Sequence, residues 1–219
     1  YVLSNTFVTE RNEHNMKTKN KFLAVELAVL TAFIIACVSS TMSFASACKD
    51  IRSSVLRMHV IANSDSAEDQ ALKLKVRDAV LEAGKEYFDN SESAAEAEKK
   101  LVLVKDELEA VAKKTVADNG YDYDVKVNIG NAYFPTKTYD GEVTLPAGEY
   151  KAVNVVIGSG NGHNWWCVMF PPMCLPAAES DVELDEVLSQ DEYEIVKSNP
   201  KFEPRFKIIE WYEKFIKNN

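Results

Sequence analysis

The segment from residue 158 to residue 174 holds the densest set of chemically capable side chains in the 219-residue sequence. It contains alternating glycines, a histidine, two adjacent tryptophans and two cysteines, in the order GSGNGHNWWCVMFPPMC. One interpretation makes Cys167 a nucleophile activated by His163 or His59, because a thiolate needs a nearby base or cation. Such a pair also needs a third group to orient the histidine, and nothing in the sequence singles one out.

Two other kinds of site fit this segment less well. A phosphate loop needs a helix N-terminus after its glycines, and usually a lysine, and neither follows the three alternate glycines here. A metal site built from His59, His163 and Cys167 lacks the short-range ligand pair that such sites normally contain. We therefore expect neither a metal ion nor a cofactor.

A further interpretation makes the segment a structural and recognition element. The glycines allow a tight turn, Trp165 and Trp166 supply large amphipathic surfaces, and Pro171-Pro172 ends a strand. In a strand the two tryptophan rings point to opposite faces, so one ring can join the core while the other contacts a partner.

A leader precedes the part of the chain that must hold these residues. Three lysines from Lys17 to Lys21 come before the uncharged 12-residue run Leu27–Val38, and small residues follow at positions 45–47. This order is typical of a secretory signal, and the run is shorter than the roughly 20 apolar residues of a membrane span. Residues 16–47 are therefore expected to be a signal peptide or a membrane anchor. Residues 1–15, before Met16, are expected to be a non-native or mis-started extension.

The rest of the chain, residues 51–219, is expected to be a single domain, which the leader would export. A hydrophobic content of 46% is sufficient for one core. The net charge of −9 disfavours nucleic acid and anionic membrane surfaces, which both attract cationic proteins. Membrane contact is expected through the leader.

The cysteines differ in their surroundings. Cys37 lies in the apolar run, whereas Cys48 follows Ala-Ser-Ala and loosely resembles the lipidated residue of a lipoprotein, without the usual leucine. In an exported protein, Cys167 and Cys174 are either a disulfide or two reduced, buried thiols.

Periodicity predicts a single α/β (α+β) domain. Residues 55–62 have the composition of a buried strand, and Ser66 and Ser93, each with an acid three residues later, indicate capping boxes that start two helices. From Tyr121 the period becomes two, and Asp140-Gly141 marks a hairpin between residues 133–139 and 142–145. Residues 152–157 form the most strongly β run. We expect a mixed or mainly antiparallel sheet packed against the two helices, plus a C-terminal helix.

That C-terminal helix has an apolar stripe formed by Phe206, Ile209, Tyr212 and Ile216. The acidic stretch before it, residues 179–194, is expected to be a solvated helix and loop.

Three sequence blocks closely resemble one known family. They are MHVIANSD at 58–65, DQALKLKVRDAV at 69–80, and the stretch from NVVIG at 154 through GHNWWCVMFPPMC at 162–174. Together they resemble stage II sporulation protein R of endospore-forming bacteria, over about residues 51–175.

The resemblance implies a developmental signal that is not an enzyme. Such proteins are made in the forespore and secreted across its membrane into the intermembrane space. There they activate a membrane-embedded aspartic protease of the mother cell, which removes the pro-sequence of sigma E. The matching positions imply candidates for partner binding or structure: His59, Asn63, Asp65, His163, Asn164, Trp165 and Trp166, with Cys167 and Cys174 as the candidate disulfide.

Two alternatives stay open: an exported cysteine-dependent envelope hydrolase, and an envelope protein anchored by a lipid on Cys48. Structural roles also stay open for three of the candidates. Asn63 and Asp65 would also suit the turn that leads into the first helix, and His59 would suit a half-buried strand position.

Overall fold

The computed structural model describes residues 2–139, 142–172, 187–197 and 202–217. Two compact units make up the chain: residues 1–46, and residues 47–219, which contain the sheet. Helix α1 (Val2–Ser54) begins in the first unit and ends in the second.

Helix α1 is much longer than the uncharged run within it. Its part Lys19–Ser54 is long and apolar enough to cross a membrane, judged by length and composition, with a mean hydropathy of 2.4 over an 18-residue window. Polar residues are accommodated because the hydroxyls of Thr31 and Thr41 donate to carbonyl oxygens four residues earlier. A signal peptide and a membrane anchor both fit this helix, so both predictions for the leader stand.

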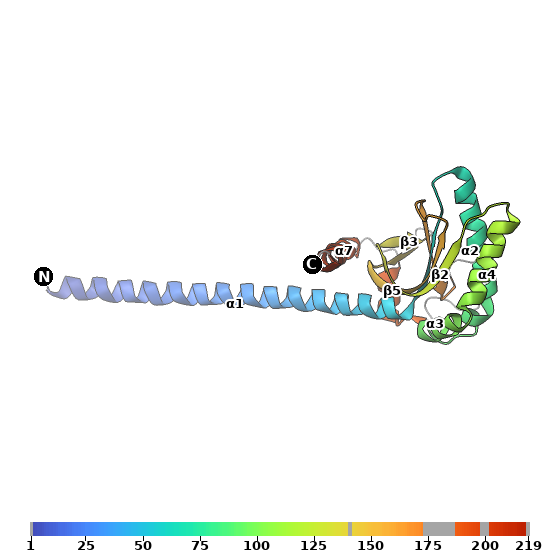
Figure 1. Ribbon diagram of the computed structural model, residues 1–219. Helices are drawn as coiled ribbons and strands as arrows, with labels where there is room; N and C mark the ends of the chain where they lie inside the picture. Colours follow the sequence, from blue (N-terminus) through green and yellow to red (C-terminus); the bar gives the residue numbers. More distant parts are fainter. Residues whose placement is uncertain (1, 140–141, 173–186, 198–201, 218–219) are drawn as a thin grey trace. The chain divides into compact units, whose positions relative to one another are not determined.

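A four-stranded mixed sheet forms the centre of the second unit (Figure 1). Its strands are β1 (Leu56–Ile61), β2 (Val125–Phe134), β5 (Gly148–Ile157) and β6 (Asn164–Phe170), in the order β2-β5-β1-β6. β1 runs parallel to β5, whereas β1 with β6 and β2 with β5 are antiparallel. The predicted mixed sheet is confirmed, and the first strand of the chain lies in its interior.

Three helices cover one face of this sheet: α2 (Ala67–Asp89), α3 (Ala94–Leu103) and α4 (Lys105–Asp118) (Figure 1). The prediction of a single helix after Ser93 is wrong, because the chain leaves helical geometry at Val104, with φ −108° and ψ 13°. Leu101 and Leu108 are fully buried on either side of the break. The apolar stripe therefore continues across the break.

The predicted helix starts are confirmed, but each capping box is only half formed. The side-chain oxygens of Ser66 and Ser93 accept hydrogen bonds from the backbone N–H groups of Asp69 and Glu96. Neither acid bonds back to its serine: Asp69 accepts from the hydroxyl of Ser64, and Glu96 accepts from the N–H of the residue before its serine. The Asp69 carboxylate therefore contacts the loop before α2 instead of completing the capping box.

The hydrophobic core lies between the sheet and these three helices. It combines an apolar stripe of α2 with apolar residues of α3 and α4 and with alternate residues of the strands. Burial of each large apolar side chain contributes about 1.5–3 kcal/mol. Its members include Leu56, Met58, Val60, Leu72, Val76, Val80, Phe88, Leu101, Leu108, Val153, Val155 and Met169.

A short hairpin lies on the other face of the sheet. Strands β3 (Lys137–Tyr139) and β4 (Val143–Leu145) pair antiparallel, as the hairpin prediction requires, although residues 140–141 lie outside the described residues. The hydroxyl of Tyr139 accepts a hydrogen bond from Arg57 of β1, which ties the hairpin to the sheet.

The Arg57 side chain is fully buried on this second face. Its guanidinium carbon lies 4.0 Å from the ring centroid of Phe134 and 4.7 Å from that of Tyr150. Its Nε and Nη1 groups have no hydrogen-bond partner among the described residues. Aromatic rings, instead of a carboxylate, are the main neighbours of this cation.

Helices α6 (Gln190–Val196) and α7 (Glu203–Lys217) end the described chain. α6 begins with a complete capping box, and residues 179–186 of the predicted acidic stretch lie outside the described residues. α7 is the predicted C-terminal helix. Phe206 and Ile209 are buried as the stripe requires, but Tyr212 is exposed, so the stripe points only partly into the core.

Candidate recognition site

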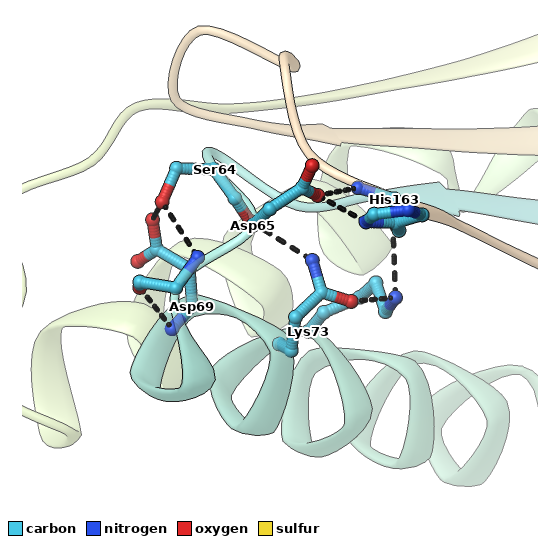
Figure 2. Close-up of polar contacts among 7 residues, drawn as sticks. Ser64, Asp65, Asp69, Lys73 and His163 are labelled. Carbon is cyan, nitrogen blue, oxygen red and sulfur yellow. Dashed lines mark hydrogen bonds and ion pairs between the residues drawn. The ribbon is translucent and has the colours of Figure 1, made fainter.

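Polar residues that follow β1 and β5 meet at one edge of the sheet. The two strands are parallel, and Ile61 pairs with Val156, so the loops after them leave the sheet side by side. We call residues 62–66 and 158–163 the paired loops. Figure 2 shows their polar contacts with the first turns of α2.

Asn63 joins the paired loops. Its Oδ1 accepts a hydrogen bond from the backbone N–H of Ser159 at 3.0 Å, and its backbone carbonyl accepts from the hydroxyl of the same serine at 2.8 Å. Gly158 has φ +56°, and a Cβ there would lie 2.3 Å from Oδ1 of Asn63. This position requires glycine because of both its backbone conformation and the close approach of Asn63.

Asp65 holds the end of the second loop. Its Oδ1 accepts a hydrogen bond from the backbone N–H of His163 at 2.6 Å and also contacts Nδ1 of the His163 ring (Figure 2). Both side chains are mostly exposed. The loops also approach closely at Gly162, where a Cβ would lie 2.2 Å from the carbonyl oxygen of Ser64. The glycines at 158 and 162 therefore permit close loop packing.

Two buried charged residues of α2 support the loops from below. The Asp69 carboxylate accepts from the Ser64 hydroxyl at 2.5 Å, and this bond lowers the pKa of Asp69 below its ordinary value. Lys73 donates to the side chain of Gln70 at 2.6 Å and to the carbonyl oxygen of His163 at 3.0 Å. Burial lowers the pKa of Lys73. The geometry of the paired loops thus depends on two charged side chains, Asp69 and Lys73, that are buried in the domain.

Sequence reasoning missed Lys73 and gave Asp69 only a capping role. A signal for both was present, since they stand one turn apart on α2. Lys73 also directly follows Leu72, a member of the apolar stripe. A lysine there must find polar partners for its ammonium group as its stem is buried.

A second group of candidates lies on the hairpin face of the sheet. The Nε2 atom of His59 lies 2.8 Å from Oδ1 of Asn164. The His59 ring is 5.8 Å from Trp166 and 6.0 Å from Phe134, measured between ring centroids. The indole N–H of Trp166 is buried without a hydrogen-bond partner among the described residues. His59 is half-buried, which suits the structural role considered for it.

Trp165 points to the opposite face of β6, as expected for neighbouring residues of a strand. Its ring is 37% exposed, and the guanidinium carbon of Arg77 lies 4.5 Å from its centroid. Of the two adjacent tryptophans, Trp165 is therefore the one that presents more apolar surface to solvent.

The cysteines do not assemble a catalytic pair within the described part of the chain. Cys167 belongs to the core, on the face of the sheet opposite His59, and His163 contacts Asp65 instead. Cys174 lies outside the described residues, so its pairing with Cys167 stays a prediction. Cys48 has a buried, free thiol within α1, and its lipidation likewise stays a prediction.

The described residues contain no cluster of three or more His, Cys, Asp or Glu side chains suited to a metal ion. The chemistry that the paired loops do offer is hydrogen bonding and charge at a surface held by fixed backbone contacts. Such an arrangement suits recognition of another molecule.

Comparison with known proteins finds relatives of one kind. The family model described as stage II sporulation protein R matches residues 52–180, which include the paired loops and the whole four-stranded sheet. The chain is 40% identical over 119 residues to stage II sporulation protein R of Bacillus subtilis (strain 168). The alignment covers 54% of this chain and 53% of the relative, so the chain spans about half the length of that curated protein. No solved structure matches.

Proposed function

The chain belongs to the stage II sporulation protein R family, and on this premise we propose that it is an exported signal from the forespore to the mother cell. It crosses the forespore membrane into the intermembrane space and activates a membrane-embedded aspartic protease of the mother cell. The protease then removes the pro-sequence of sigma E. The family match over residues 52–180 is the observation that carries the proposal.

Features of the chain itself support this role. The apolar part of α1 suits export or membrane attachment. The paired loops offer an exposed polar surface at Asp65 and His163, and Trp165 adds exposed aromatic area two residues further along the chain. Tryptophan is a favoured anchor in protein interfaces.

Activation by such a signal requires a difference in affinity. The signal must bind the active form of the protease more tightly than the inactive form, because equal affinity shifts no equilibrium. A surface whose loops are already held by Asn63 and Asp65 loses little conformational freedom on binding, which favours tight, stoichiometric contact.

The test is to produce the full chain together with the protease and the sigma precursor and to score processing of the precursor. Omission of the chain should abolish processing. Trp165→Ala should reduce processing about tenfold or more, as expected for loss of an interface anchor. Leu103→Ala is the matched control, since Leu103 is an 85% exposed apolar residue of α3. Normal processing with the Trp165 variant would remove this residue from the interface.

The same assay separates the signalling role from the alternatives. Cys167→Ser and the double change Cys167→Ala/Cys174→Ala address the envelope hydrolase and the disulfide. If a double variant that accumulates normally still supports processing, both a cysteine enzyme and an essential disulfide are ruled out. Mass measurement of the mature N-terminus decides whether Cys48 carries a lipid.

A further inference from the structure

Helix α7 presents an aromatic face that is exposed among the described residues of the domain. Phe206 and Ile209 are buried and attach the helix, whereas Trp211 is 72% exposed and Phe215 is 61% exposed. The two exposed rings stack, with centroids 6.4 Å apart. Ile208 and Tyr212 are also exposed. A continuous apolar surface of this kind marks an interaction site more often than a freely solvated one.

An ion pair ties α7 to the end of α1. Glu213 Oε1 lies 3.5 Å from Nη2 of Arg52. The exposed large apolar residues of α1 end at Met42, ten residues before Arg52. The intervening chain spans about 15 Å as a helix and at most about 35 Å when fully extended. The covalent connection therefore limits how far α7 can lie from a membrane that holds the apolar part of α1.

The charges of α7 also suit a lipid surface better than those of the chain as a whole. The net charge of the chain is −9, but α7 itself has four basic residues against three acids, and two of these acids, Glu210 and Glu213, are paired locally. Glu210 pairs with Lys214 at 2.8 Å and with Lys207 at 3.7 Å, and Glu213 pairs with Arg52. Tryptophan and tyrosine beside lysine are the residues that settle at the headgroup level of bilayers.

We propose that α7 lies in the surface of the membrane that the apolar part of α1 enters, with Ile208, Trp211, Tyr212 and Phe215 inserted at the headgroup level. This contact orients the domain on the membrane and would persist after removal of the leader. The proposal does not depend on which protein the domain activates.

The full chain is reconstituted in phosphatidylcholine vesicles whose acyl chains carry bromine, which quenches nearby indoles. The chain has three tryptophans, so variants assign the signal. The wild-type protein should show quenching that is lost in Trp211→Phe, a conservative change at an exposed position. Trp165→Phe is the matched control and should keep that quenching.

Two results would overturn the proposal. One is equal quenching in wild type and Trp211→Phe, which would place this ring in water or against another protein; cross-linking between copies would then identify a dimer contact. The other is an equal loss in Trp211→Phe and Trp165→Phe, which would mean that lipid reaches the domain without preference for α7. Neither outcome bears on sigma-factor processing, so the proposed function is tested separately.

Discussion

Replacing Gly162 by alanine probes the contact between the paired loops directly. The new Cβ would lie 2.2 Å from the carbonyl oxygen of Ser64, whereas ordinary contacts begin at 3.4 Å. One loop must therefore move by about 1 Å. This movement strains three hydrogen bonds: Gly162 N–H to Ala62 O at 2.9 Å, His163 N–H to Asp65 at 2.6 Å, and Lys73 to His163 O at 3.0 Å.

The expected loss in unfolding free energy is about 3 to 5 kcal/mol, taking about 1 kcal/mol for a neutral hydrogen bond and about 2 for each one to a charged group. Urea unfolding of the full chain in detergent micelles, followed by tryptophan fluorescence, measures it. Gly130→Ala is the control for an added methyl, since nothing lies within 4 Å of its Cβ position.

Gly120→Ala separates backbone strain from the steric clash. Gly120 has φ +82° and also has nothing within 4 Å of its Cβ position, so its replacement should cost only about 1 kcal/mol. If Gly162→Ala destabilises the domain no more than Gly120→Ala does, the loops accommodate the extra methyl and the packing argument is refuted.

Two further stability measurements follow from buried charges. Because the pKa of Asp69 is lowered in the folded domain, its carboxylate stabilises the fold above the ordinary pKa of about 4, and this contribution is lost as the pH falls below it. Unfolding free energies of wild type and Asp69→Asn should therefore differ by about 2 kcal/mol at neutral pH and converge in acid; a constant difference would contradict this. Arg57→Met should stay within about 1 kcal/mol of wild type in urea unfolding, because aromatic rings surround the guanidinium, whereas Arg57→Ala leaves a cavity and should cost about 3 kcal/mol. A large loss with methionine would show that the cation itself stabilises the fold.

Local features of the fold could be predicted from the sequence, since their causes are local. Ser66 and Ser93 are recognisable as helix caps because a hydroxyl before an amphipathic stripe satisfies free N–H groups. The break at Val104 could not be predicted. No glycine or proline marks it, and the spacing of Leu101 and Leu108 suits a helix on both sides of it.

The candidate site was predictable as a set of residues but not as an arrangement. Asn63 and Ser159 are neighbours only because β1 pairs in parallel with β5, and strand order is not encoded in the period of either strand. Lys73 was missed for the same reason, since its partner at residue 163 lies 90 positions away. The opposite directions of Trp165 and Trp166 followed from strand geometry alone.

The position of β1 has a consequence for when the sheet can form. This strand is the first of the sheet to be synthesised, yet its neighbours, β5 and β6, are the last two strands of the sheet in the chain. Pairing over such long sequence separations is slow, because the conformational entropy of the intervening chain must be lost before the stabilising contacts can form. The sheet therefore cannot be completed until residues near 170 have been made, and such late completion suits the export proposed above, because an unfolded chain is what passes through a membrane.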